Sequence, residues 1–341
     1  MIRALVVEDS DTVRQLLVRM LQDDPEIRVI GAARDGLEAV EMAHRLHPDV
    51  ITMDIQMPRL DGLQATKRIM QQVPTPIIVV SAAVHSDLEV AFNATRAGAL
   101  TVIEKPGGPA GPDYATIRDH LITTVKLMAD VKVVRRWTTG FLERREPILH
   151  PRPREVQTAV VCMAASTGGP AAFYQLLKEL PGDFPVPILI VQHITRGFGR
   201  GMVKWLDGTT QLVVEIAADG QELSAGRVLV APDDQHLTIG ADGNVRLQPP
   251  AASDRICPSA DLLFASAAHV LGRKALAVIM TGMGRDGAEG LKQLKAAGGR
   301  VVAQDERSCI VFGMSKEAIE AGVVDRVEPL ERLATTVLEM L

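Results

Sequence analysis

Ser166, in the stretch CMAASTGGPAAF (162–173), is the first candidate for chemistry, and a threonine and two glycines follow it. Ser166 follows an apolar run typical of a buried strand and precedes Pro170, which is typical of the first turn of a helix. Ser166 could therefore be a nucleophile, part of a phosphate-binding loop, or a helix cap formed with Thr167. A phosphate-binding loop needs Lys-Ser/Thr after its glycines, or a GxGxxG turn with a later acidic residue. Neither pattern is present, which leaves the nucleophile and the cap.

A nucleophilic serine needs a base within reach and an acid that orients the base. His193 ends the apolar run VPILIVQHI (186–194), and Asp286 lies in the glycine-rich turn after ALAVIMTG (275–282). If these strands are neighbours in a parallel sheet, all three side chains emerge at one edge. Taken alone, His193 is more typical of a structural histidine, and Asp286 could equally cap the helix that follows it. The three together favour a hydrolase.

Backbone N–H groups for an oxyanion are available beside the serine. The glycines after Ser166 keep such groups accessible, and Met283, flanked by Gly282 and Gly284, could add another donor. The GxSxG elbow of α/β-hydrolases is a poor match, because Ala164 replaces its first glycine and because the chain order here is Ser, His, Asp.

A second set of polar residues follows the strands predicted near the N-terminus. Glu8 and Asp9 end one predicted strand. Three further strands end at Asp54, Ser81 and Lys105. Three carboxylates at one sheet edge would repel each other unless a hard cation such as Mg²⁺ bound them. Asp54 could then accept a phosphoryl group, with Ser81 and Lys105 binding its oxygens. The alternative is a set of solvated loop carboxylates.

The elements that must position these residues alternate between strand and helix. In the first part of the chain, strands are predicted at 2–9, 28–33, 49–55, 76–82 and 99–106, and helices at 11–22, 36–46, 62–72, 87–98 and 113–134. This alternation predicts an α/β domain with a doubly wound parallel sheet over residues 1–130. Residues 131–155 contain prolines and mixed charge without periodicity, as expected for a linker.

The alternation resumes in a second domain, residues 156–341. Strands are predicted at 158–164, 186–194, 275–282 and 300–305, and helices at 169–180, 261–272 and 287–298. A β-rich insert, 212–248, carries turn signals and predicts hairpins beside the main sheet. The fold class is therefore α/β, with two doubly wound parallel-sheet domains.

The motifs VVED, DIQMPRLDG, VVSA and EKP, in this order and spacing, resemble the receiver domain of response regulators over about residues 1–125. The resemblance implies a flavodoxin-like fold, with Asp54 as phosphoacceptor and Glu8, Asp9 and Asp54 around Mg²⁺. Ser81 and Lys105 would be the phospho-switch residues. Val102 stands where receivers often carry an aromatic switch.

The motifs AASTGGP, VQHI, APDDQHL, ICPSADLLF, TGMGRDGAEG and AQDERSCIVFGMSKEAI resemble the catalytic domain of the CheB family, the chemotaxis receptor protein-glutamate methylesterases. The resemblance covers about residues 156–341 and implies a Rossmann-like fold. It implies a catalytic triad of Ser166, His193 and Asp286, with Thr167 and Met283 in the oxyanion and active-site turns. Ser315 stands where the family usually has proline.

Together the two resemblances imply hydrolysis of glutamate methyl esters on methyl-accepting chemoreceptors, and deamidation of receptor glutamines. A chemotaxis histidine kinase would activate the enzyme by phosphorylating Asp54 with Mg²⁺, and ester hydrolysis itself would need no cofactor. The alternative from another class is a phosphorylation-dependent interaction module that does not turn over. A receiver that controls DNA binding is less favoured, because the second half has neither a basic patch nor a compact helix-turn-helix signature.

Composition sets the remaining limits. The net charge of −5 gives no reason to expect nucleic-acid binding, and three widely spaced cysteines predict reduced thiols. No apolar run approaches the ~20 residues of a membrane span, so we expect no membrane insertion and a cytoplasmic location.

Overall fold

The computed structural model describes residues 1–81, 92–95, 97–106, 108, 114–131, 157–194, 196–254 and 256–341. The chain divides into two compact units, unit 1 (Met1–Pro147) and unit 2 (Ile148–Leu341). The predicted linker, 131–155, lies almost wholly outside the described residues. None of the helices in the described ranges is long and apolar enough to cross a membrane.

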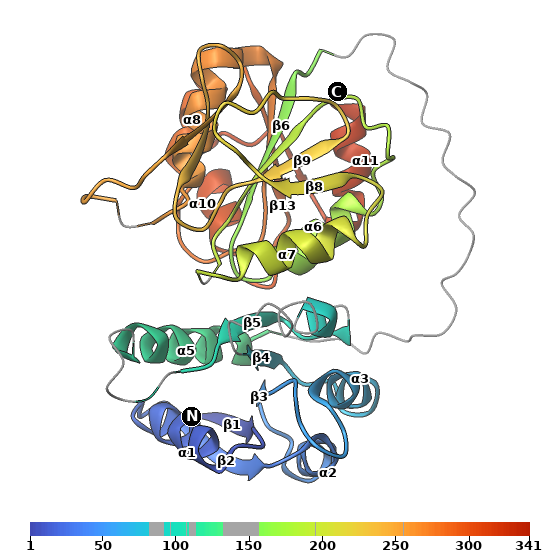
Figure 1. Cartoon of the computed structure of the whole chain (residues 1–341), viewed down its shortest axis with the longest axis vertical. Coiled ribbons are helices and arrows are strands. Elements are labelled where there is room, and N and C mark those ends of the chain that lie inside the picture. The colour runs from blue at the N-terminus through green and yellow to red at the C-terminus, as the bar shows by residue number, and fades with distance from the viewer. Residues whose placement is uncertain are drawn as a thin grey trace. The chain divides into compact units, whose positions relative to one another are not determined.

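Unit 1 is built on a parallel sheet with the strand order β2-β1-β3-β4-β5 (Figure 1). This order is the flavodoxin-like one, and it reverses between β1 and β3, which is where such folds form their sites. Its elements are β1 (Ile2–Val7), α1 (Asp11–Gln22), β2 (Ile27–Ala33), α2 (Gly36–Leu46), β3 (Val50–Met53), α3 (Gly62–Gln72), β4 (Ile77–Ser81), β5 (Thr101–Glu104) and α5 (Tyr114–Ala129).

Capping residues start the first three helices of unit 1. The side chains of Ser10, Asp35 and Asp61 accept hydrogen bonds from the first N–H groups of α1, α2 and α3. Helix α1 packs with α5, and α2 packs with α3, so the two pairs cover the two faces of the sheet. The helix predicted at 87–98 falls largely outside the described residues, although residues 92–95 are helical.

Unit 2 contains a seven-stranded parallel sheet in the order β14-β13-β12-β6-β7-β9-β8. Its elements are β6 (Val160–Ala165), α6 (Gly169–Leu177), β7 (Ile188–Gln192), α7 (Gly199–Asp207), β8 (Val213–Ile216), β9 (Arg227–Val230), β10 (His236–Ile239), β11 (Val245–Gln248), α8 (Ala260–Leu271), η1 (Gly272–Lys274), β12 (Ala275–Ile279), α9 (Ala288–Ala296), β13 (Arg300–Gln304), α10 (Met314–Glu320), β14 (Arg326–Glu328) and α11 (Leu330–Glu339).

The β-rich insert differs in part from the prediction. Strands β10 and β11 pair antiparallel and form the expected hairpin. Strands β8 and β9 do not form a hairpin, because they pair parallel to one another and extend the main sheet from β7. The turn signal at Gly220, whose φ is +75°, lies within the connection from β8 to β9 rather than in a tight hairpin turn.

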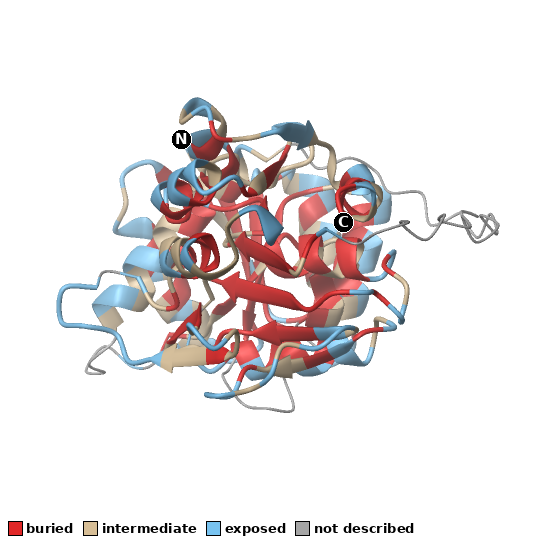
Figure 2. Ribbon diagram, turned by 90° about the horizontal axis from the view of Figure 1, so that it is seen from above, coloured by how far each residue is buried: buried red, intermediate tan, exposed pale blue. Residues whose placement is uncertain are grey.

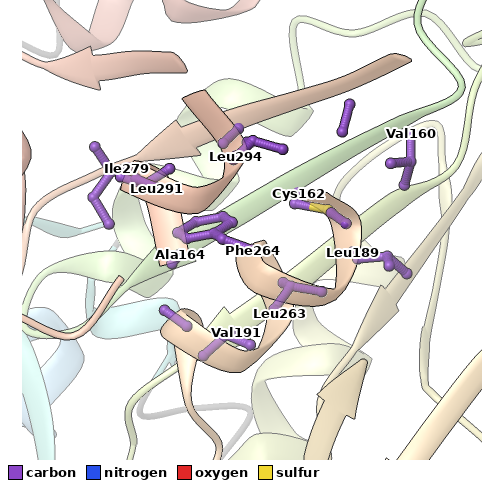
Figure 3. Packing of buried hydrophobic residues seen from close by; sticks show 14 of the residues in the cluster. Val160, Cys162, Ala164, Leu189, Val191, Leu263, Phe264, Ile279, Leu291 and Leu294 are labelled. Atoms are coloured by element: carbon purple, nitrogen blue, oxygen red, sulfur yellow. The ribbon is translucent and has the colours of Figure 1, made fainter. Parts of the chain in front are cut away.

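Helices cover both faces of this sheet, with α8 and α10 on one side and α6 and α11 on the other (Figure 1). Buried residues are concentrated on the strands between them (Figure 2). Figure 3 shows side chains of α8, including Phe264, packed with Leu291 and Leu294 of α9 against Cys162 and Val191 of the sheet. This packing holds α8 against β6 and β12, and α9 against α8 and β13.

Candidate functional site

Three polar side chains follow three adjacent strands of unit 2. Strand β6 lies between β7 and β12 at the point where the strand order reverses, so its end is a favoured position for a site. Ser166 follows β6, His193 follows β7, and Asp286 lies in the turn after β12. The backbone pairing continues past the strands, because Ser166 N–H donates to Thr281 O at 3.0 Å and His193 N–H donates to Ala165 O at 3.0 Å.

His193 and Asp286 are directly paired. Nε2 of His193 lies 2.8 Å from Oδ2 of Asp286, and both side chains are largely shielded from solvent. An ionised carboxylate is only an acceptor, so in this contact Nε2 carries the hydrogen. The lone pair of a neutral ring is then on Nδ1, which makes Nδ1 the atom able to take a proton.

Asp286 is held by the N-terminus of α8. Its oxygens accept hydrogen bonds from Ser259 Oγ at 2.9 Å and from the N–H groups of Ala260 and Asp261 at 2.6 and 3.1 Å. Burial alone would raise the pKa of Asp286, but the hydrogen bonds from His193 and Ala260 outweigh it and lower the pKa to about 2. The carboxylate therefore stays ionised at neutral pH.

The two helix-cap alternatives are not what the structure shows. The N-cap of α6 is Gly168, which has no side chain to cap with, and neither Ser166 nor Thr167 caps that helix through its side chain. Pro170 does occupy the first turn of α6, as predicted. Asp286 binds the start of α8 rather than that of α9, the helix directly after it.

The turn that carries Ser166 is tightly packed against the turn after β12. A Cβ added to Gly282 would lie 2.7 Å from Cβ of Ser166, so only glycine fits there. Thr167 accepts a hydrogen bond from Thr281 Oγ1 through its carbonyl at 2.9 Å. Met283 follows Gly282 and is exposed. The structure thus brings Thr167 and Met283, the two predicted oxyanion-turn residues, next to the serine turn.

Among the described residues, Ser166 Oγ has no hydrogen-bond partner, and its side chain remains partly accessible to solvent. Catalytic hydrogen bonds to a serine are often long or poorly aligned without substrate. A serine hydroxyl can reach a new partner by rotation about a single bond.

Two buried side chains that sequence reasoning missed support this turn. Gln192 Nε2 donates to the carbonyls of both Ser166 and His193 at 2.8 Å, which ties the ends of β6 and β7 together. Thr281 Oγ1 accepts N–H bonds from Ile310 and Val311 at 3.1 and 3.0 Å. The only available signal was their position in the motifs VQHI and TGMG, directly beside predicted site residues.

The acidic residues of unit 1 also meet at one sheet edge. One oxygen each of Glu8, Asp9 and Asp54 lies within 4.8 Å of the others. Lys105 Nζ lies 2.9 Å from Asp54 Oδ1 and 3.0 Å from Glu8 Oε2. Ser81 accepts the Lys105 N–H through its carbonyl at 2.8 Å, and it is buried. All five predicted residues are therefore brought together.

The charges of this cluster do not balance. Three carboxylates face one ammonium group, which leaves an excess of negative charge. Burial, followed by the charge of Asp54, raises the pKa of Glu8 to about 7. Burial also raises the pKa of Asp54, against the lowering effect of Lys105. Burial is the main cause of both shifts, and the single charge of Lys105 does not offset it.

The donor set fits a magnesium ion. Asp54 Oδ1 accepts the Ile55 N–H at 2.7 Å, but Asp54 Oδ2 is buried and has no hydrogen-bond partner in the described part of the chain. An unpartnered, buried carboxylate oxygen beside two further carboxylates is the hard oxygen set that Mg²⁺ prefers.

Two family models match the chain. CheB methylesterase matches residues 161–337, and Response regulator receiver domain matches residues 4–111. The catalytic domain of Thermotoga maritima CheB methylesterase, a crystal structure, is 38% identical, with a TM-score of 0.52 over 54% of this chain and 99% of that one.

Two relatives match over nearly the whole length of both chains. A protein-glutamate methylesterase/protein-glutamine glutaminase of Myxococcus xanthus is 48% identical over 98% of this chain and 95% of its own. One of Syntrophus aciditrophicus is 43% identical over 100% of this chain and 98% of its own. The chain therefore belongs to the CheB methylesterase family, with a response regulator receiver domain in its first part.

Proposed function

We propose that this chain is a protein-glutamate methylesterase and protein-glutamine glutaminase that phosphorylation of its receiver domain activates. Its substrates would be glutamate methyl esters and glutamines on methyl-accepting chemoreceptors, and its phosphodonor a chemotaxis histidine kinase. The names of the Myxococcus xanthus and Syntrophus aciditrophicus relatives support the reaction class. We assign the receiver to residues 1–130 and the methylesterase domain to residues 156–341.

The observation that carries the proposal is the 2.8 Å contact between His193 Nε2 and Asp286. His193 follows β7, and Ser166 follows β6, the strand that pairs with it. The contact with Asp286 sets the tautomer of the ring, so that Nδ1 serves as the base. An orienting carboxylate of low pKa holds the ring without taking its proton.

In the first half-reaction, Ser166 Oγ attacks the ester carbonyl carbon while His193 Nδ1 takes the hydroxyl proton. The N–H groups of Thr167 and Met283 would stabilise the negative oxygen. The tetrahedral intermediate then expels the methoxy group, which takes the proton from Nδ1 and leaves as methanol. With a glutamine substrate the leaving group is ammonia.

In the second half-reaction, Nδ1 takes a proton from water, and the resulting hydroxide attacks the glutamyl-serine ester. Collapse of this intermediate returns the proton to Ser166 Oγ and releases the glutamate side chain. The net reaction consumes one water and forms one methanol and one carboxylic acid, which ionises to a carboxylate and releases one proton.

Control is assigned to Asp54 in the receiver. Glu8, Asp9 and Asp54 would hold Mg²⁺, which offsets negative charge during phosphoryl transfer to Asp54. Lys105 would bind an oxygen of the acyl phosphate and Ser81 another. Phosphorylation acts by favouring one of two domain arrangements, which is a population shift.

The test measures methanol released from methylated receptor membranes. Wild type, Ser166→Ala and Asp54→Ala are compared with and without a small-molecule phosphodonor and Mg²⁺. We expect no release from Ser166→Ala, and stimulation by the phosphodonor only where Asp54 is present. If phosphorylated wild type released no methanol from several receptor preparations, the esterase proposal would be wrong, and a non-catalytic signalling module would replace it.

A further inference from the structure

His236 is a buried histidine outside the proposed reaction, and both of its ring nitrogens are engaged. It lies in β10 and is 2% exposed. Nδ1 accepts the N–H of Ser259 at 3.1 Å, and Nε2 lies 3.0 Å from Asp254 Oδ2. Because Nδ1 is an acceptor here, the hydrogen is on Nε2, where the carboxylate receives it. The ring is therefore fixed in one tautomer and one orientation.

Ser259, which donates its N–H to His236, is also the first of three consecutive residues that donate hydrogen bonds to Asp286. Ser259 is the N-cap of α8, and its Oγ donates to Asp286 Oδ1 at 2.9 Å. The next two residues, Ala260 and Asp261, donate their N–H groups to the same carboxylate. Three consecutive residues thus form a cradle for Asp286, and His236 holds the first of them through its backbone.

We infer that His236, oriented by Asp254, is a positioning residue that sets Ser259 and so aims Asp286 at His193. The inference rests on the proposed function, because the aim of Asp286 matters only if His193 acts as the base. The contacts form a continuous series, in which Asp254 contacts His236, His236 contacts Ser259, Ser259 contacts Asp286, and Asp286 contacts His193.

These contacts affect how strongly the carboxylate of Asp286 accepts the hydrogen of His193. Hydrogen bonds from the His193 ring and from the Ala260 and Asp261 N–H groups lower the pKa of Asp286, and the hydrogen bond from Ser259 Oγ favours the ionised carboxylate in the same way. If Ser259 moves away, Asp286 has fewer donors and binds a protonated His193 more strongly. The acid limb of the pH profile then moves to higher pH, and the His193 ring is also less well oriented for transfer from Ser166.

Other charged groups surround the two ends of the series and are common to every variant below. Asp261 interacts with Asp286, and it is present unchanged in every variant of His236. At the other end, Asp254 interacts with His236, Ser253 and the Ala251 N–H, and Asp254, Asp234 and Arg196 all act on the nearby Cys257. Since a substitution of His236 alters none of the others, a change in the pH profile reports the series itself.

The test compares His236→Asn with His236→Leu in the full chain. Asparagine can accept the Ser259 N–H in place of Nδ1, whereas leucine cannot and is of similar size. We expect His236→Leu to lower kcat for methanol release about tenfold, with KM within about twofold, and to move the acid limb of kcat/KM to higher pH. We expect His236→Asn to restore most of kcat and the wild-type limb.

A packing role predicts the opposite order, because a buried apolar leucine is tolerated better than a buried amide. The inference is overturned if His236→Leu keeps the wild-type rate and pH profile, or if His236→Asn is no better than His236→Leu. The matched control is His269→Gln, which changes an exposed histidine in the last turn of the same helix α8. This control should leave kcat, KM and the acid limb of kcat/KM unchanged.

A second variant and a second readout keep the inference independent of folding and of the natural substrate. Asp254→Asn removes the carboxylate at the exposed end of the series, and it should shift the acid limb in the same direction by a smaller amount. Sulfonylation of Ser166 by phenylmethanesulfonyl fluoride, followed by mass spectrometry, measures activation of the serine without a receptor. If wild type reacts with the reagent but releases no methanol, the proposed substrate fails. If wild type and His236→Leu react equally at every pH, the inference fails.

Discussion

Asp286 and Asp261 each bind the first N–H groups of the other's helix. Asp286, which directly precedes α9, accepts from the Ala260 and Asp261 amides at the start of α8. Asp261, in the first turn of α8, accepts from Gly287 and Gly290 at the start of α9, at 2.9 and 2.8 Å. Both carboxylates therefore face the positive ends of helices. This exchange locks the two helices together and holds an ionised carboxylate at the edge of the sheet beside His193.

The low pKa of Asp286 predicts a pH window for stability. Its pKa is lowered from 3.8 to about 2, so the ionised carboxylate stabilises the folded chain. That contribution is complete above about pH 4 and is lost as the pH falls through about 2, and it amounts to roughly 2 kcal/mol. We expect Asp286→Asn to lower the free energy of unfolding near pH 5, by an amount that shrinks as the pH falls below about 4.

Chemical denaturation at a series of pH values measures this difference. Asp219→Asn, in an exposed loop of the same unit, is the control and should show no comparable window. A difference between wild type and Asp286→Asn that grows as the pH falls below 4 would contradict the assignment of the carboxylate as ionised.

Gly282→Ala should displace the turn that carries Ser166. The added methyl group would lie 2.7 Å from Ser166 Cβ and 2.4 Å from Met314 Sδ, closer than real contacts allow. Misplacing a reacting atom by about 1 Å can cost on the order of 100-fold in rate. We expect kcat for methanol release to fall by about that factor while the chain still folds.

Gly208→Ala is the matched control for this change, because Gly208 has a φ of −71° and room for a methyl group. Circular dichroism and the midpoint of thermal unfolding establish that both variants fold. Wild-type turnover by Gly282→Ala would mean that the serine turn does not need this close contact.

The sequence predicts the three polar residues at the strand ends better than it predicts the residues that hold them in place. Ser166 and His193 directly follow buried strands, and such strands in a parallel sheet are continuous apolar runs that are visible in the sequence. Asp286 follows another such run after a short turn. The alignment of the three depends only on the order of β6, β7 and β12, which the α/β alternation makes plausible.

The support behind this edge depends on contacts that no local pattern contains. His236 lies in a hairpin strand and contacts Ser259, which is 23 positions away, and no local pattern around either residue indicates this contact. The pairing of β8 with β9 in parallel was also missed, because Gly220 is a turn signal whether or not the flanking strands form a hairpin. The role of Asp286 as a cap was considered for the adjacent helix, whereas packing in three dimensions places α8 within reach.

Gln192→Met should loosen the link between Ser166 and His193. The amide of Gln192 donates to the carbonyls of both residues, and methionine has a similar length but no donor. Two partly buried carbonyls would each lose a hydrogen bond, so we expect stability to fall by about 1 to 3 kcal/mol. Because the two strand ends can then separate, kcat should fall about tenfold.

Thermal unfolding and methanol release measure the two effects of this change. Gln248→Met, at the exposed end of β11, is the control and should alter neither. If Gln192→Met lost stability but kept full kcat, the amide would be a packing element rather than a link that aligns the serine with the histidine.

Asp9→Asn should weaken the binding of Mg²⁺ to unit 1 without altering its fold. Asp9 is the exposed member of the carboxylate cluster, so its removal leaves the buried contacts of Glu8 and Asp54 with Lys105 in place. A ligand that binds only the folded state stabilises it, by about 2.7 kcal/mol at a hundred times its Kd. We expect Mg²⁺ to raise the unfolding midpoint of the wild type and to raise that of Asp9→Asn much less.

Asp11→Asn is the matched control for this change. It removes a carboxylate two positions later, where the side chain pairs with Arg14, and it should respond to Mg²⁺ like the wild type. Equal stabilisation of all three proteins by Mg²⁺ would place the ion away from this cluster.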